Sequence, residues 1–410
     1  MSQQGPILIV SSRPNPPAAK TLADAKVFPI IDTDWAGASE AVTRVQPAAI
    51  ILADCANGGQ FFAALAQQTE NLQPFVPVIA LDPKLPLPSS IQPFTQTGSL
   101  PRIAARLNAA LRTRLLHATV LRRLTDEKTS SVRLPENDPL QDATVLLLGR
   151  GGSFPTLSIA LGEQSAVVGA LSIEAAAKHL NSREIDGIVI GEGFTPRVVD
   201  AFLMVVSEDP RFRNLPIILS QMGGLRDYDL PNLEIAAQPP EDLAASALPL
   251  IRLRAFESRL HRVLKSIDVG GLLDPRTGLL TEQAFHRDLV HAVEETLSRG
   301  TGLALAKFSF PSVQERSRFD AARILSRLMR RMDFATLGED GTIIAVFAET
   351  DLRTTQMIVR RLTSVMKQTV LGRKRNEHLD PDVTVAALQP LDTVDALLAR
   401  LNDSRERAVS

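Results

Sequence analysis

Short apolar runs and longer mixed stretches alternate along the first 120 residues. The apolar runs lie at Gly5–Val10, Ala48–Leu52 and Pro77–Leu81, and their length and composition suit buried strands. Between and after them, Gly59–Gln68 and Leu100–Leu116 have the composition of helices. Strands that alternate with helices in this way predict a parallel sheet with helices on both faces.

A polar stretch then interrupts the pattern, and the same rhythm begins again. Residues 127–141 lack a regular apolar period and predict a linker. Apolar runs return at Ala143–Leu148, Ile185–Ile190 and Leu215–Leu219, and a helix is expected from Glu241. Two successive units with one order of elements predict a tandem pair of similar domains.

The helix that ends the second unit is expected to continue as a connector. In Arg252–Lys265, apolar residues recur at helical spacing, which predicts a rigid connection and a surface for dimerisation. The predicted division has a first domain at 1–120, a linker at 121–141, a second domain at 142–250, a helical connector at 251–270 and a third domain at 271–410.

Composition narrows the class of protein without naming a function. The chain has 410 residues, of which 44% are hydrophobic and 22% charged, and this balance is typical of globular domains. The net charge of −1 provides no general attraction to nucleic acid or to anionic lipid. The single cysteine, Cys55, suits a reducing compartment, and no apolar run reaches the roughly 18 residues of a membrane span. We therefore expect a cytoplasmic protein without a membrane or nucleic-acid partner.

Several segments of the first two units resemble response-regulator receiver domains. Residues 77–82 and 216–221 look like the fourth receiver strand, and Gln92 and Gln238 precede proline where that family has lysine. The resemblance covers most of both units. It implies two tandem flavodoxin-like domains, each with a doubly wound parallel sheet.

Receiver phosphorylation requires an aspartate nucleophile, carboxylates that hold Mg²⁺, and a lysine. Other residue types stand at the carboxylate positions: Ser11, Ser12 and Ala53 in the first unit, and Gly149, Arg150 and Gly191 in the second. Asp54 lies one residue beyond the acceptor position, and we interpret it as a solvated loop residue instead of a phosphoacceptor. The resemblance thus implies two pseudo-receiver domains.

The third unit resembles the GGDEF domain of diguanylate cyclases. Asp274–Leu280 is similar to the opening motif of that family, and Asp333–Leu352 aligns without gaps with its signature hairpin and the segment that follows. The β-branched and aromatic run Ile343–Phe347 supports a strand after the turn. The resemblance implies an α/β domain with a central mixed sheet.

The residues through which the family binds metal and GTP are absent at the matching positions. The five signature positions read Glu339, Asp340, Gly341, Thr342 and Ile343. The first strand offers Lys307 and Ser309 where the family has a metal-binding aspartate. Two-metal phosphoryl transfer needs carboxylates to hold the ions. We therefore expect no catalytic residues, no bound metal and no cofactor.

One family site is retained in this register. Diguanylate cyclases carry an inhibitory Arg-x-x-Asp site upstream of the signature, and it falls on Arg330 and Asp333, with Arg331 between them; a supporting arginine aligns with Arg361. Arginine can pair with phosphate or with the guanine edge. Five other Arg-x-x-Asp spacings occur in the chain, so the spacing alone carries little information. A solvated face of arginine and aspartate is the alternative.

The resemblance implies a non-catalytic effector of bacterial signalling with the domain order of PleD-like cyclases. Its ligand would be cyclic di-GMP, and the signal would pass to an unidentified signalling protein, with homodimerisation through the receiver-like domains. Two alternatives stay open: a ligand-independent scaffold for protein interactions, and a residual cyclase.

Overall fold

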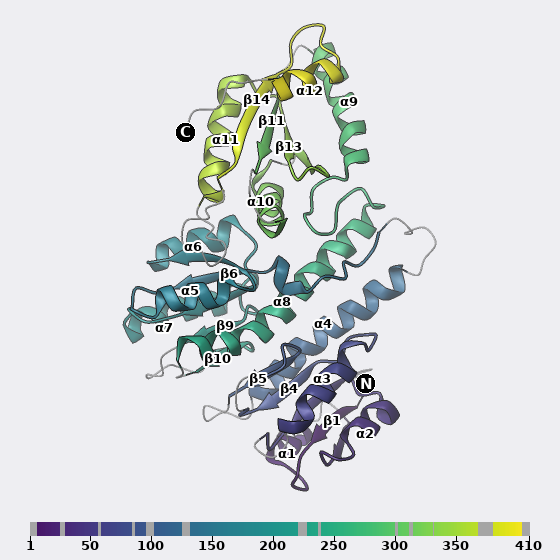
Figure 1. Ribbon diagram of the computed structural model, residues 1–410, viewed down its shortest axis with the longest axis vertical. Coiled ribbons are helices and arrows are strands. Elements are labelled where there is room, and N and C mark those ends of the chain that lie inside the picture. The colour runs from purple at the N-terminus through teal and green to yellow at the C-terminus, as the bar shows by residue number, and fades with distance from the viewer. Residues whose placement is uncertain are drawn as a thin grey trace.

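The computed structural model describes residues 6–24, 29–55, 59–83, 87–95, 102–124, 132–219, 228–236, 239–299, 302–310, 315–330, 332–367 and 380–403. Three α/β units follow one another along the chain, and in Figure 1 the first and third units lie at opposite ends of an elongated molecule. Within the described residues, no helix has both the length and the apolar character that a membrane span requires.

The first unit is built on a parallel sheet with the strand order β2-β1-β3-β4-β5. Its strands are β1 (Ile7–Val10), β2 (Ile30–Thr33), β3 (Ala49–Leu52), β4 (Val78–Leu81) and β5 (Ile91–Phe94). Its helices are α1 (Pro17–Asp24), α2 (Ala38–Val45), α3 (Phe62–Glu70) and α4 (Arg102–Leu124), with a short 3-10 helix, η1 (Gly59–Phe61). The central strands are apolar at every position because helices cover both faces of the sheet.

The second unit repeats this topology. Its sheet has the order β10-β9-β8-β6-β7, which is the order of the first sheet counted from the other edge. The strands are β6 (Thr144–Leu148), β7 (Ala166–Ala170), β8 (Gly187–Ile190), β9 (Ile217–Leu219) and β10 (Leu233–Ile235). The helices are η3 (Pro139–Asp142), α5 (Phe154–Gly162), α6 (Ile173–Ser182) and α7 (Pro196–Glu208). The prediction of parallel sheets covered by helices is confirmed.

One helix joins the second unit to the third. Helix α8 runs without a break from Pro240 to Asp268, which confirms the prediction that the helix expected from Glu241 continues through Arg252–Lys265. It packs along α4 of the first unit, as Figure 1 shows. Helix α4 itself continues to Leu124, into residues expected to form the linker.

The third unit has a four-stranded sheet with helices on both sides. Its strands are β11 (Leu303–Ser309), β12 (Phe334–Leu337), β13 (Ile343–Ala348) and β14 (Asp382–Ala387), in the order β12-β13-β11-β14. Its helices are α9 (Glu282–Arg299), α10 (Glu315–Leu328), α11 (Leu352–Met366) and α12 (Val394–Asp403).

The expectation of a mixed sheet in this unit was wrong for its named strands. All three of their pairings are antiparallel. Each helical crossover returns the chain in the original direction but skips one position in the sheet, so an antiparallel strand separates the two parallel ones. Among the described residues of this unit, a parallel contact occurs only at an isolated bridge between Leu280 and Thr336.

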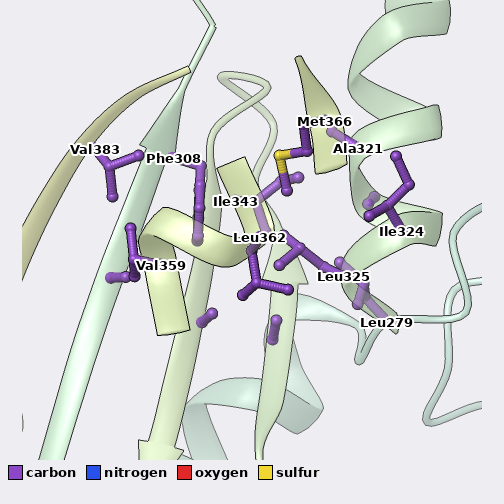
Figure 2. Close-up of a cluster of buried hydrophobic side chains, with 14 of the residues drawn as sticks. Leu279, Phe308, Ala321, Ile324, Leu325, Ile343, Val359, Leu362, Met366 and Val383 are labelled. Carbon is purple, nitrogen blue, oxygen red and sulfur yellow. The ribbon is translucent and has the colours of Figure 1, made fainter. Parts of the chain in front are cut away.

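Apolar side chains fill the space between this sheet and its helices. On one face, α10 and α11 contribute residues such as Leu325 and Leu362, which pack on Phe308 and Ile343 of the sheet (Figure 2). On the other face, α9 and α12 bury a second cluster that includes Leu289 and Leu397. The sheet and the hairpin β12–β13 are therefore held rigidly between two helical layers.

Candidate functional site

The hairpin turn that aligns with the family signature is held by side chains of the turn and of helix α9. Asp340 accepts hydrogen bonds at Oδ1 from the backbone N–H of Thr342 at 2.9 Å and from its hydroxyl at 2.7 Å. Although partial burial opposes it, these bonds hold the pKa of Asp340 below its ordinary value. The backbone N–H of Glu339 donates to Oε1 of Glu282 at 3.0 Å. The carboxylate of Asp340 is thus used to form the turn.

The space over the turn is occupied by an arginine from α10. Gly341 has φ +77°, which favours glycine, and a Cβ at this position would collide with the guanidinium of Arg318. A nucleotide would have to lie close to Gly341 to bind here. The guanidinium of Arg318 already fills that space.

The first strand presents a lysine where a metal site would need a carboxylate. Lys307 in β11 lies opposite Ile344 and Thr384, and its Nζ donates to Oδ1 of Asn402 at 2.9 Å. Within the described residues, no group of three or more histidine, cysteine, aspartate or glutamate side chains could hold a metal ion.

Arg330 and Asp333 lie in one turn between α10 and β12. The backbone N–H of Asp333 donates to the Arg330 carbonyl at 3.0 Å. In return, Oδ2 of Asp333 accepts from the Arg330 backbone N–H at 3.2 Å, and Oδ1 accepts from the Ala348 N–H at 3.2 Å. Burial raises the pKa of Asp333, which is half-buried. Each carboxylate oxygen keeps a second lone pair for another donor.

The two arginines are available to a ligand. The Arg330 and Arg361 side chains are exposed, and in the part of the chain that the structure describes neither guanidinium has a hydrogen-bond or ion-pair partner. Arg361 lies on α11, and Arg331 lies outside the described residues. The structure therefore brings Arg330 and Asp333 together and records no contact between them and Arg361.

Solved GGDEF domains resemble part of this chain. The coiled coil and GGDEF domain of DgcB from Caulobacter crescentus, in complex with c-di-GMP, is 17% identical, with a TM-score of 0.29, and the match covers 35% of this chain and 83% of that one. The GGDEF domain of FimX from Pseudomonas aeruginosa is 19% identical, with a TM-score of 0.28 and coverage of 32% and 89%.

Diguanylate cyclase SiaD from the same bacterium, in complex with its activator SiaC, is 17% identical, with a TM-score of 0.29 and coverage of 35% and 64%. No family model and no curated protein matches the chain. These structural matches cover about a third of the chain, so its function has to be inferred from its own residues.

The structure also places several of the residues that the receiver resemblance singled out in the first two units. In the first unit, Ser11 is buried and its Oγ accepts from the Arg13 N–H at 3.1 Å, and Asp54 has φ +57° in the loop after β3. In the second unit, the guanidinium of Arg150 lies 5.3 Å from the centre of the Phe194 ring. Gln92 is buried, whereas Gln238 lies outside the described residues.

Sequence reasoning missed a set of buried charges between the second and third units. Asp320 and Arg323 of α10 are buried. Asp320 lies 3.6 Å from Arg183 at the end of α6 and accepts from the Thr144 hydroxyl at 3.1 Å. Arg323 donates to the Asp142 carbonyl. In the sequence these residues look like the polar face of a surface helix, and only their partners 130 or more positions away show otherwise.

The contact between the second and third units extends along α10 towards the turn that contains Arg330. Arg327, one helical turn earlier, donates to the carbonyls of Arg183 at 2.5 Å and Leu180 at 3.2 Å. Arg183 also donates to the Val365 carbonyl near the end of α11 at 2.6 Å. The candidate site therefore borders the surface where the third unit meets the second.

Proposed function

We propose that this protein is a non-catalytic relative of the GGDEF family that binds cyclic di-GMP and passes the signal to a partner protein. The observation that carries the proposal is the turn in which an unpaired Arg330 guanidinium stands beside the Asp333 carboxylate, at the edge of the contact between the second and third units. The Arg318 side chain that lies over Gly341, and Lys307 at the position where the family has a metal-binding aspartate, support the non-catalytic part.

The chemistry of the turn suits a guanine nucleotide. Arg330 can donate paired hydrogen bonds to a phosphodiester or to O6 and N7 of guanine. The remaining lone pairs of Asp333 can accept from N1 and N2 of the same base. The exposed Arg361 offers a second positive charge to a ligand that carries two phosphodiesters.

Binding at this turn would act on the docking of the domains. Arg327 holds the same end of α10 to carbonyls of the second unit. A ligand that also contacts Arg330 would favour the arrangement in which that end of α10 is fixed. Such coupling requires a difference in affinity between the two arrangements, and the signal to a partner would be this change in docking.

Isothermal titration of cyclic di-GMP into the full chain tests the proposal. We expect micromolar or tighter binding to the wild type and a loss of at least tenfold in Arg330→Ala, because a charged hydrogen-bond donor to the ligand is removed. Arg353→Ala is the control, since Arg353 is an exposed arginine of α11 outside the candidate site. Absence of heat with the wild type, or equal binding by Arg330→Ala, would contradict the proposal. Formation of cyclic di-GMP from GTP and Mg²⁺ would contradict the non-catalytic part.

A ligand-independent scaffold is the second candidate, and one observation favours it. Both oxygens of Asp333 already accept backbone N–H groups, so the Arg-x-x-Asp pattern has a structural use without any ligand. In that case the titration gives no heat, and a pull-down with the intact chain still captures a specific partner.

A further inference from the structure

A separate pocket of about 250 Å³ lies where the second unit, helix α8 and the third unit meet. Its lining includes four cationic side chains, Arg262, Lys265, Arg323 and Arg327, and one carboxylate, Glu184. Four positive charges against one negative charge leave an excess of three. The proposed cyclic di-GMP site does not account for this excess.

Arg262, one of these four cations, has a buried N–H group that has no hydrogen-bond acceptor among the described residues. Arg262 donates through Nη1 to Oε2 of Glu184 at 2.8 Å and through Nε to the Pro275 carbonyl at 3.1 Å. Its side chain is 11% exposed. Its Nη2 is buried and has no hydrogen-bond partner among the described residues. A buried donor of this kind is costly to leave unpaired, and an acceptor in the pocket would remove that cost.

The other two arginines are held by neutral groups. Arg323 donates to the carbonyls of Phe319, at 3.2 Å, and Asp142, and Arg327 donates to those of Arg183 and Leu180. Backbone carbonyls orient a guanidinium without neutralising its charge. Lys265 is exposed and has no ion pair within the described part of the chain.

The carboxylates behind the pocket are mostly paired with arginines outside it, although Arg323 also acts on Asp142 and helps to lower its pKa against the effect of burial. Asp142 lies 2.6 Å from Arg259, and Asp320 pairs with Arg183. Asp186 accepts from the Thr144 N–H and the Ser258 hydroxyl, and burial raises its pKa, which disfavours its charged form. Although burial opposes it, Arg262 and Arg323, with two further arginines, hold the pKa of Glu184 below its ordinary value. Glu184 is therefore the charged counter-ion of the pocket, and alone it does not balance the cations.

We propose that this junction pocket binds a small phosphate-bearing anion, with Arg262 Nη2 as the inner donor and Lys265 and Arg327 at the opening. A phosphate or pyrophosphate group offers several acceptors and more than one negative charge, and arginine matches its geometry. A water molecule takes up roughly 30 Å³ of liquid, so the volume is sufficient for such a group. Because the lining comes from three parts of the chain, the complete site exists only when they are docked, and its ligand stabilises that docking.

Thermal unfolding and titration of the full chain with inorganic phosphate and pyrophosphate, at constant ionic strength, test the proposal. Pyrophosphate is expected to raise the melting temperature of the wild type. Lys265→Met should weaken binding roughly threefold, as loss of an exposed charge does, and Arg262→Met roughly tenfold or more. Lys178→Met, at an exposed lysine of α6, is the matched control and should bind as the wild type does. Lys265→Met keeps the test valid if Arg262→Met fails to fold.

The source of the phosphate is separated by a second titration with cyclic di-GMP. If junction variants weaken only pyrophosphate and Arg330→Ala weakens only cyclic di-GMP, the two sites are independent and the pocket takes a separate anion. If the junction variants weaken both, the nucleotide supplies the phosphate. Absence of any pyrophosphate effect at millimolar concentration, or an equal effect in the wild type and both junction variants, overturns the pocket proposal. Both of the results that would overturn the pocket proposal are measured with pyrophosphate alone, so they do not depend on whether Arg330 binds a ligand.

Discussion

Asp333 combines a structural and a candidate binding role in one carboxylate. Its two oxygens tie the turn after α10 to the end of β13 through the N–H groups of Arg330 and Ala348. The sequence predicted Asp333 as a ligand residue, and its spacing from Arg330 could be read directly. Its bond to Ala348, 15 positions later, depends on the hairpin register and had no local signal. The prediction that Asp333 binds the ligand is therefore tested by the titration with cyclic di-GMP, which separates its binding role from its structural role.

His179 is a buried residue through which acid should act on the stability of the folded chain. It is buried in α6, and burial, with Arg183 and Lys178 nearby, lowers its pKa from 6.5 to about 4. The unfolded chain takes up a proton near pH 6.5, whereas the folded chain resists until about pH 4. The free energy of unfolding should therefore be unaffected by this group above pH 6.5 and fall as the pH drops from 6.5 towards 4.

Urea unfolding of the wild type and of His179→Phe over this pH range measures the effect. The variant should show a shallower fall in midpoint than the wild type, since its side chain does not titrate. His286→Phe removes an exposed histidine and is the control. Parallel curves for the wild type and His179→Phe would show that His179 is not responsible.

At the scale of elements, most strands and helices follow from the apolar pattern. Helix α8, strand β13 and three strands of each of the first two units appear where periodicity predicted them. Strands β2, β5, β7 and β10 were not predicted. The antiparallel order of the third sheet could not be predicted, because strand neighbours depend on crossovers that local sequence does not encode. For the same reason α10 was not identified as a contact helix: Asp320 and Arg323 differ from solvent-facing charges only through distant partners.

The contact made by α10 can be tested with the Arg183–Asp320 pair. Both side chains are buried and lie 3.6 Å apart. Asp320→Ala removes the carboxylate that pairs with Arg183. We expect the free energy of unfolding to fall by about 3–5 kcal/mol. Breaking the exposed Arg44–Glu40 pair by Glu40→Ala, as the control, should cost less than about 1 kcal/mol.

A double-mutant cycle with Arg183→Met and Asp320→Leu, followed by urea unfolding, isolates the pair. The double variant should be more stable than the single variant Asp320→Leu, because the buried charge of Arg183 is removed together with its partner. If Asp320→Ala costs no more than the exposed control, α10 is not held by this pair.

At the scale of the whole molecule, one buried ion pair joins the first unit to the second. Arg106 of α4 lies 2.7 Å from Glu234 of β10, and it also donates to the carbonyls of Pro231, Pro93 and Leu233. The other oxygen of Glu234 accepts from the Thr95 N–H at 3.1 Å. The pair therefore joins the sheet edge of each unit to the helix between them, and Figure 1 shows α4 and α8 side by side at this junction.

Removal of the Glu234 charge should release the first unit. In Glu234→Gln the Arg106 guanidinium stays buried without a counter-ion, which costs about 3–5 kcal/mol, a large share of the net stability of a typical folded protein. Small-angle X-ray scattering should then give a larger radius of gyration, because the terminal unit separates while its own core stays intact. Arg112→Met removes an exposed contact to Asn214 across the same junction and should leave the scattering unchanged. Equal scattering by Glu234→Gln and Arg112→Met would mean that apolar packing of α4 on α8 is sufficient, and a ligand-driven change in docking would then be confined to the contact between the second and third units.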